Sequence, residues 1–190
     1  MAKRLAIGLS EGFADWECAL LMATARDDLG IAVATLTPGG RDVSSVGGLS
    51  VVSGGLLEEA SPADYEAFVL CGGKIWQSAE KPDLERPVRQ FIEAGKPVAA
   101  ICDATLELAR LGLLDTRAHT SNFAGMLEEW APGYGGAAHY RDEPQAVSDG
   151  GIITASGAAP VTFAAAVLAA IGFDTPELRS YLGLYGAEHR

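Results

Sequence analysis

The sequence has little cysteine, histidine or positive charge. Its three cysteines form no CxxC pair and its three histidines are equally dispersed, so neither a disulfide framework nor a metal site is indicated. Free thiols instead suit a reducing, cytoplasmic compartment. The 14 Lys and Arg residues are scattered among 25 Asp and Glu, and the formal net charge of −11 repels phosphates and anionic lipids. We therefore expect no metal or other cofactor, no nucleic-acid partner and no membrane partner.

Long apolar runs are also missing. The N-terminal stretch reaches Glu11 after only about six apolar residues, which is too short for a signal peptide. The later run 158–171 contains Pro160 and is shorter than the roughly 20 residues that span a bilayer. The composition is that of a globular protein, with 48% hydrophobic and 21% charged residues. We expect residues 1–190 to form one domain that buries a core without disulfide or metal support.

Short apolar runs alternate with segments of helical periodicity. The runs predict strands at 4–9, 31–36, 67–71, 97–101 and near 118–121, with hairpins at 43–52 and around 149–151. The periodic segments predict helices at 16–28, 83–94, 104–111, 123–130, 160–171 and 176–183. Continuous apolar strands separated by helices favour a doubly wound α/β fold, with a mostly parallel sheet covered by helices on both faces.

Cys102 is the most informative residue at the end of a predicted strand, where ligands of such sheets bind. It stands between a buried strand and a helix with no spacer, which is typical of a nucleophile elbow. The start of a helix favours a thiolate, so a lowered pKa is expected there. The alternative is a buried structural cysteine, because free cysteine is among the most buried residue types.

Two other segments end strands at the same predicted edge. Gly72-Gly73 suits a close approach of backbone to a ligand, and with the Asp103 N–H it would supply two oxyanion donors; the alternative is an ordinary turn. Glu17 starts the first predicted helix near the same edge, where a partly protonated carboxyl would donate a hydrogen bond to a thiolate; Glu11 and Asp15 are alternatives, and a solvated helix start is the simpler interpretation.

The other cysteines and two tryptophans have weaker signals. Cys71 ends a buried strand and suits core packing, whereas Cys18 suits either the core or a second redox-accessible thiol. Trp16 and Trp76 either line the pocket or belong to the core.

Several motifs together resemble the ThiJ/PfpI superfamily, which includes the parkinsonism-associated deglycase and is related to class I glutamine amidotransferases. The carrying motifs are ADWE (14–17), VLCGG (69–73), GKPVAAIC (95–102), LARLGLL (108–114), HTSNF (119–123) and GGIITASGAAP (150–160). With the FDTPE tail (173–177) they most resemble a YdeA-like bacterial subgroup. The resemblance implies a flavodoxin-like fold, a homodimer, Cys102 as nucleophile, Glu17 as its carboxyl partner, and Gly73 with Asp103 as oxyanion donors.

The chain departs from this pattern in its histidines. Many relatives have His directly after the nucleophile, where this chain has Asp103, and the deglycase branch has His where it has Asn122. His119 lies at an odd offset from Asn122, so it reaches the site only if that segment is a loop. The amidotransferase triad has no match, since Arg141 follows His139 at the triad spacing, and glutaminase activity is not expected. Asp103 either disfavours the Cys102 thiolate or caps the helix and directs its charge away.

Three hypotheses of function follow. The first is a cysteine-dependent hydrolase, glyoxalase or deglycase acting on a small carbonyl or amide compound, in which Glu17, or else Asp103 or His119, moves protons. The second is a redox-sensing or stress-response protein without turnover, in which Cys102 is oxidised to a sulfinate. The third is a binding relative that kept the fold and lost the chemistry.

Overall fold

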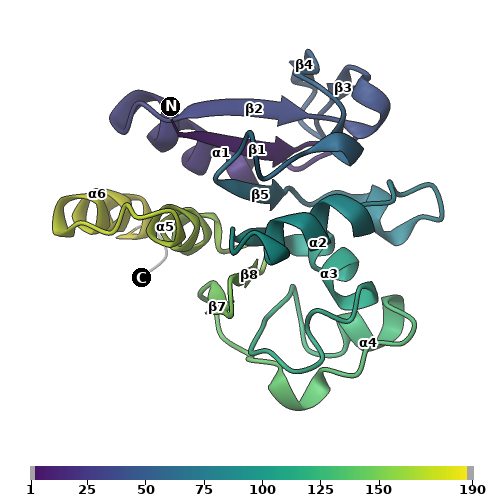
Figure 1. The fold of residues 1–190 in the computed structure, drawn as a ribbon. Helices are drawn as coiled ribbons and strands as arrows, with labels where there is room; N and C mark the ends of the chain where they lie inside the picture. Colours follow the sequence, from purple (N-terminus) through teal and green to yellow (C-terminus); the bar gives the residue numbers. More distant parts are fainter. Residues whose placement is uncertain (1–2, 188–190) are drawn as a thin grey trace.

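Five parallel strands and one antiparallel edge strand form the central sheet of the computed structural model, which describes residues 3–187 (Figure 1). The strand order is β2-β1-β5-β6-β8-β7. The strands are β1 (Arg4–Gly8), β2 (Ala32–Leu36), β5 (Ala67–Leu70), β6 (Val98–Ile101), β7 (Val147–Asp149) and β8 (Ile152–Ala155). A separate antiparallel hairpin, β3 (Val43–Ser44) and β4 (Ser50–Val51), lies near the carboxyl ends of β1 and β2. The order reverses between β1 and β5, which is where ligands bind in doubly wound sheets.

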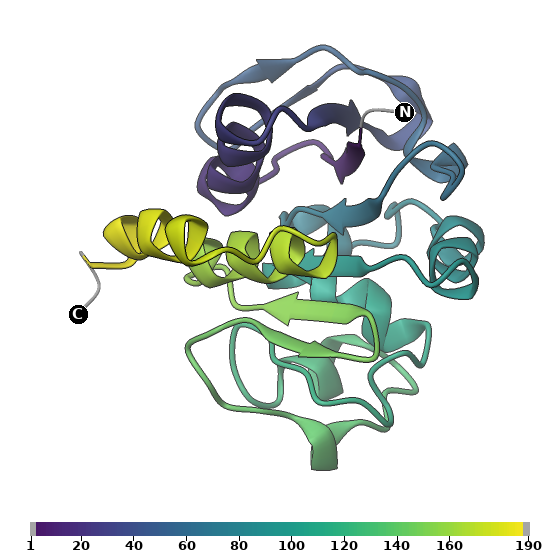
Figure 2. The same ribbon diagram turned by 60° about the vertical axis from the view of Figure 1, so that its left-hand side comes forward.

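Helices cover both faces of the sheet (Figures 1 and 2). They are α1 (Asp15–Ala23), α2 (Glu85–Glu93), α3 (Thr105–Arg110), α4 (Met126–Trp130), α5 (Pro160–Ala170) and α6 (Pro176–Gly186). Alternate residues of each strand point to opposite faces. Ile7 and Ile101 accordingly pack with α1, α5 and α6, whereas Phe68 and Ala100 pack with α2, α3 and α4. Strands buried on both faces explain why the strand segments are continuously apolar.

The predicted doubly wound fold is confirmed. The helix predicted over 16–28 has the expected extent, as α1 followed by a π-helical segment, Thr24–Asp28. The strand predicted near 118–121 is wrong: the segment forms only an isolated bridge between His119 and Tyr140. Its N–H groups are used elsewhere, since Thr120 N–H donates to Thr154 Oγ1 at 2.9 Å and Ala118 N–H donates to the Asp149 carboxylate. These two N–H groups are therefore unavailable for a backbone ladder, and the His119 N–H makes only a long contact of 3.4 Å with the His139 carbonyl.

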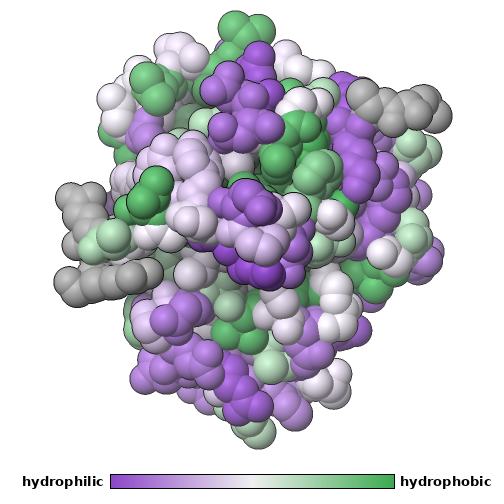
Figure 3. Space-filling view, turned by 90° about the vertical axis from the view of Figure 1, so that its left-hand side faces the viewer, coloured by the Kyte–Doolittle hydropathy of each residue, from purple (hydrophilic) through white to green (hydrophobic). Residues whose placement is uncertain are grey.

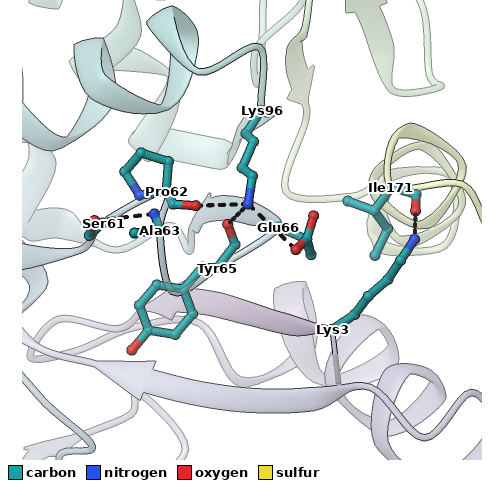
Figure 4. A network of polar contacts seen from close by, with 8 residues as sticks. All are labelled: Lys3, Ser61, Pro62, Ala63, Tyr65, Glu66, Lys96 and Ile171. Atoms are coloured by element: carbon teal, nitrogen blue, oxygen red, sulfur yellow. Dashed lines mark hydrogen bonds and ion pairs between the residues drawn. The ribbon is translucent and has the colours of Figure 1, made fainter. Parts of the chain in front are cut away.

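Two lysines bind backbone carbonyl groups at the amino-terminal edge of the sheet (Figure 4). Lys96, just before β6, donates to the carbonyls of Pro62 at 2.7 Å and Tyr65 at 2.8 Å, and its ammonium lies 3.4 Å from the Glu66 carboxylate. Lys3, just before β1, donates to the carbonyl of Ile171 at the end of α5. These contacts fix the starts of three neighbouring strands and the end of a covering helix.

The outer surface mixes polar and apolar residues. Figure 3 views the molecule from the side of α5 and α6, where hydrophobic residues are interspersed with hydrophilic ones. No helix within residues 3–187 has both the length and the apolar character to cross a membrane.

Candidate active site

Cys102 stands on a sharp turn at the carboxyl end of β6. Its φ of 60° makes it the one non-glycine residue with positive φ among residues 3–187. The chain passes from β6 into a short 3-10 turn, Cys102–Ala104, and then directly into α3. Such a conformation is rare for a residue with a side chain and concentrates at functional positions. The turn leaves Cys102 partly exposed, whereas Cys18 and Cys71 are buried.

Glu17 is a fully buried carboxyl group beside this thiol. Its Oε2 accepts a hydrogen bond from the Gly72 N–H at 2.7 Å and lies 3.7 Å from Cys71 Sγ. Its Oε1 has no hydrogen-bond partner within the described chain. A Cβ built on Gly157 would lie 3.0 Å from both this oxygen and Cys102 Sγ, so the two groups converge on one point. Burial raises the pKa of Glu17 to about 7, against the lowering effect of Cys102 and of the Gly72 N–H.

The glycines around Cys102 are required by the available space. A Cβ on Gly72 would lie 2.4 Å from Glu17 Oε2 and 2.6 Å from Cys102 Cβ, which is closer than real contacts allow. At Gly73 a Cβ would lie 3.1 Å from the carbonyl oxygen of Gly12. Gly72 is therefore a close approach of backbone to the thiol and carboxyl groups, whereas Gly73 closely approaches the backbone of residues 12 and 13, so the pair is not merely an ordinary turn.

Asn122 completes the surroundings of the sulfur, a role that the sequence did not reveal. Its Nδ2 donates to Cys102 Sγ at 3.2 Å and to Asp103 Oδ1 at 2.9 Å. Its Oδ1 accepts from the Gly157 N–H at 2.9 Å, which fixes the orientation of the amide. In the sequence this position was notable only for lacking the histidine of the deglycase branch. An amide here donates a hydrogen bond to sulfur and cannot act as a base.

Asp103 does not cap the helix that follows it. Neither the 3-10 turn nor α3 has a side-chain cap, and the Asp103 carboxylate accepts from Gln77 Nε2 at 2.7 Å and from Asn122. The capping interpretation is therefore wrong, because two side-chain amides hold the carboxylate beside the sulfur. Burial raises the pKa of Asp103, opposed first by the bond from Gln77. Gln77 is a further site residue that sequence reasoning missed, although it follows the Gly72-Gly73 segment closely.

The thiol itself keeps its proton in this environment. Burial, and then the charge on Glu17, raise the pKa of Cys102 to about 12, while the hydrogen bond from Asn122 lowers it. This direction is opposite to the one expected from the helix start alone. Burial and two neighbouring carboxyl groups destabilise the thiolate by more free energy than the start of a short helix stabilises it. A reaction at Cys102 therefore needs a group that accepts the thiol proton.

His119 is held away from this cluster. It is fully buried; its Nδ1 pairs with the Arg117 carbonyl at 2.7 Å and its Nε2 with the Tyr134 hydroxyl at 2.6 Å. Both ring nitrogens are thus engaged, and the ring also packs edge-on against Tyr134 and Tyr140. Burial lowers the pKa of His119, which favours the neutral ring. The structure does not bring His119 into hydrogen-bonding contact with Cys102.

Glu11 and Asp15, the alternatives to Glu17, form hydrogen bonds with the neighbouring β3–β4 hairpin. Glu11 accepts from the Ser44 N–H at 3.0 Å, and Asp15 binds the Ser45 hydroxyl and the Gly47 N–H. Both carboxylates hold the β3–β4 hairpin against the start of α1. Of the candidate acids in 11–17, only Glu17 reaches the thiol.

The two tryptophans divide between core and site. Trp76 is fully buried and donates to the Cys71 carbonyl at 2.8 Å, so it belongs to the core. Trp16 is 55% exposed, and its Nε1 donates to the Gly157 carbonyl at 3.0 Å. The Trp16 ring is therefore anchored next to the backbone that approaches Cys102 and Glu17.

A doubly wound sheet with a cysteine elbow and a buried glutamate defines a class of cysteine-centred α/β proteins. Within it, the chain belongs to the DJ-1/PfpI family, whose model matches residues 3–170. It is 34% identical to the uncharacterized protease YdeA of Bacillus subtilis (strain 168) over 194 residues, covering 100% of this chain and 94% of that protein. The resemblance to the ThiJ/PfpI superfamily and its YdeA-like members is thus confirmed.

Solved structures agree with this membership. The DJ-1 superfamily protein Atu0886 from Agrobacterium tumefaciens is 43% identical, with a TM-score of 0.94 over 99% of this chain and 100% of that one. A thiJ/pfpI family protein from Bacillus anthracis is 32% identical, with a TM-score of 0.86 over 97% and 91% of the two chains. These values extend the shared fold to essentially the whole chain.

Proposed function

We propose that the protein is a cysteine-dependent enzyme that acts on a small carbonyl or amide compound. The observation that carries this proposal is the convergence on one point beside Gly157 of Cys102 Sγ and Glu17 Oε1, an oxygen with no hydrogen-bond partner in the described part of the chain. A thiol whose pKa is raised to about 12 needs a proton acceptor, and a carboxyl whose pKa is raised to about 7 is ionised at or just above neutral pH. In the proposed pair Cys102 is the nucleophile and Glu17 is the base that accepts its proton.

In the proposed first step Cys102 attacks the carbonyl carbon of the substrate. The S–C bond forms as the thiol proton passes to the Glu17 carboxylate, and the carbonyl π electrons move to the oxygen. An aldehyde such as methylglyoxal gives a hemithioacetal. An amide gives a tetrahedral adduct, which expels its amine as Glu17 protonates the leaving nitrogen. The resulting thioester is then hydrolysed by water. The charge on Glu17 disappears during attack, which removes the repulsion that disfavours the thiolate.

The backbone N–H groups of Gly73 and Asp103 are the proposed oxyanion donors. Gly73 is extended, with φ of 161°, and Asp103 stands in the first turn after the elbow, where N–H groups lack acceptors within the helix. Donors of this kind stabilise the negative oxygen that develops during attack. Asn122 positions the sulfur, and Gln77 with Asn122 holds the Asp103 carboxylate beside it, with Oδ1 3.7 Å from Sγ. His119 has no part in this mechanism because its ring nitrogens are engaged elsewhere.

The redox-sensing hypothesis has weaker support. Asn122 Nδ2 and the Glu17 carboxyl are placed to hold sulfinate oxygens, but peroxides react with thiolates, and the raised pKa keeps Cys102 protonated. The name of the YdeA relative favours cleavage of amide bonds. The homodimer implied by the resemblance stays a prediction.

Turnover of methylglyoxal and of small amino-acid amides by the full chain tests the proposal. Cys102→Ser is expected to reduce kcat/KM at least about a thousandfold, and Glu17→Gln about a hundredfold, the lower range for loss of a general base. Wild-type kcat/KM should rise as pH increases through about 7, the pKa of Glu17, and this limb should vanish in Glu17→Gln. Alkylation of Cys102 by iodoacetamide should become faster in Glu17→Gln, because removing the charge lowers the thiol pKa.

A fall in turnover with a rise in alkylation separates a proton acceptor from a merely structural residue. Turnover that persists in Cys102→Ser would overturn the proposal. Absence of turnover, together with selective addition of two oxygen atoms to Cys102 by mild peroxide, would favour the redox hypothesis. Absence of both would favour a binding protein.

A further inference from the structure

The reacting sulfur lies beside two carboxyl groups and has no positively charged partner. Asp103 Oδ1 lies 3.7 Å from Cys102 Sγ, and Glu17 Oε1 converges with the sulfur on one point beside Gly157. Within residues 3–187, no Lys or Arg side chain forms a hydrogen bond or an ion pair with Cys102, Asp103 or Glu17. A substrate that bonds to the sulfur therefore enters a region of negative potential.

Asp103 carries the more persistent of the two negative charges. Gln77 Nε2 donates to its Oδ2 at 2.7 Å and Asn122 Nδ2 donates to its Oδ1 at 2.9 Å, and donors on both oxygens favour the ionised form. Burial raises the pKa of Asp103, and both of these hydrogen bonds lower it. Glu17 instead has a pKa of about 7 and becomes neutral when it accepts the thiol proton in the proposed reaction. The Asp103 carboxylate remains charged beside the sulfur throughout the attack.

The surroundings of Asp103 preserve its electrostatic effect on the sulfur. The residue is only 8% exposed, so little water separates its carboxylate from the thiol. Charges in partly buried sites interact more strongly than in bulk water and are less screened by salt. Lys74 is a cation that also acts on Asp103, but its side chain is exposed and forms no ion pair with the carboxylate within residues 3–187. The negative charge of Asp103 is therefore only weakly compensated.

The proposed reaction brings charges on the substrate close to this carboxylate. The reacting carbon bonds to Sγ, and a substituent on that carbon lies about two bond lengths, roughly 3 Å, from the sulfur. Because Asp103 Oδ1 is 3.7 Å from Sγ, the substituent lies within roughly 7 Å of the carboxylate. Two negative charges at that separation, at the effective dielectric constant of a partly exposed site, slow the attack by about tenfold.

We infer that Asp103 makes the site selective for the charge of its substrate, and that carbonyl compounds with an anionic group next to the reacting carbon are disfavoured. Methylglyoxal, which is neutral, is favoured over glyoxylate, which is anionic. Amino-acid amides, which carry a positive α-ammonium group, are favoured over oxamate, an amide with an adjacent carboxylate. The named substrates rest on the function proposed above, whereas the charge preference is a property of the surroundings of Cys102 alone.

Alkylation of Cys102 in the full-length protein tests the charge preference without turnover. Iodoacetamide is neutral and iodoacetate is anionic, and with both reagents the thiolate forms an S–C bond and releases iodide. The ratio of the two rates cancels the fraction of thiolate, so it is independent of the Cys102 pKa. Measured by peptide mass spectrometry, this ratio should be about tenfold higher at Cys102 than for N-acetylcysteine amide, a neutral free thiol. Asp103→Asn should remove most of the difference.

Matched controls separate the charge of Asp103 from other negative charges. Asp64→Asn causes the same change in net charge at an exposed position before β5, at the opposite edge of the sheet, and should leave the ratio unchanged. In Glu17→Gln the preference for iodoacetamide should persist, which separates Asp103 from the neighbouring carboxyl group. Circular dichroism shows whether each variant is folded. The comparison of the wild type with the free thiol remains decisive if Asp103→Asn does not fold.

The inference is overturned if the wild-type ratio equals that of the free thiol, if folded Asp103→Asn keeps the full preference, or if Asp64→Asn loses as much of it. When kcat/KM is measured, methylglyoxal should exceed glyoxylate by about tenfold, and Asp103→Asn should narrow this gap. Turnover with a ratio equal to that of the free thiol would contradict the charge preference and leave the proposed function standing. Absence of turnover with the preference intact would contradict the proposed function and support the charge preference.

Discussion

The two edges of the sheet differ in how fully their polar groups are hydrogen-bonded. At the amino-terminal edge Lys96 binds two carbonyls and lies near a carboxylate, and Lys3 binds the end of α5. At the carboxyl-terminal edge Glu17 and Ser10 are buried and each has a side-chain oxygen without a hydrogen-bond partner among residues 3–187, and Cys102 adopts a left-handed conformation. The polar contacts at the amino-terminal edge stabilise the fold, whereas polar groups at the carboxyl-terminal edge are available to a substrate. Functional sites commonly carry such strained or unpaired groups.

The Glu17→Gln variant tests the largest energetic difference between the edges. A carboxyl with a pKa raised from 4.5 to about 7 stabilises the folded state fully below pH 4.5, and this stability is lost as pH rises through about 7. This rise in the Glu17 pKa corresponds to about 3 kcal/mol. Urea unfolding between pH 4 and pH 8 should therefore show a decline in stability that is about 3 kcal/mol smaller in Glu17→Gln than in the wild type.

The matched control for that experiment lies at the opposite edge. Glu66→Gln changes the same residue type, but beside Lys96 and outside the active site. It should retain the wild-type decline between pH 4 and pH 8. An equal decline in wild type and Glu17→Gln would contradict the assignment of the buried charge to Glu17.

Gly72→Ala tests the tight packing of the carboxyl-terminal edge. The added methyl group would meet Glu17 Oε2 at 2.4 Å and Cys102 Cβ at 2.6 Å, so both groups must shift. We expect a loss of about 2 kcal/mol of stability, as for other overpacked sites, together with loss of turnover. Gly183→Ala in α6, where a Cβ meets no atom within 4 Å, should instead be neutral or stabilising by about 0.5 kcal/mol. Comparable destabilisation by both substitutions would refute the crowding argument.

Lys96→Met tests the amino-terminal edge alone and has the smallest expected effect. It keeps the aliphatic stem and removes the bonds to the Pro62 and Tyr65 carbonyls. Stability should fall by about 1 kcal/mol, while the rate of Cys102 alkylation at fixed pH stays unchanged. Thermal unfolding and peptide mass spectrometry measure the two quantities. A changed alkylation rate would show that the edges are coupled.

Much of the fold could be predicted from local sequence, because strands buried on both faces must be continuously apolar. The elbow at Cys102 was equally visible, since strand and helix adjoin there without a spacer. The strand predicted near 118–121 is wrong because the local residues suit a strand, whereas two of the N–H groups there bond to side chains of β7 and β8. A choice between ladder and side-chain partners depends on residues about 30 positions away.

The location of the site at Cys102 could be predicted from the sequence, but the pKa shifts and hydrogen-bond partners of its residues could not. Burial of the sulfur and of Glu17 decides the direction of the Cys102 pKa, and neither burial is encoded in the neighbouring residues. Asp103 was expected to act through the helix or against the thiol, but its partners Gln77 and Asn122 come from other parts of the chain. Motifs located the reacting atoms, while the tertiary contacts set their proton affinities.

The anchoring of Trp16 gives the protein an intrinsic optical reporter. Its indole is the most exposed of the three and is bonded to the Gly157 carbonyl, whereas Trp76 is fully buried. A soluble quencher such as acrylamide therefore reaches Trp16 and spares Trp76. Since the Gly157 N–H is bonded to Asn122, the amide that holds the sulfur and the Trp16 indole are joined through one residue. We therefore expect the quenching of Trp16 to change when Cys102 is occupied, without any attached label.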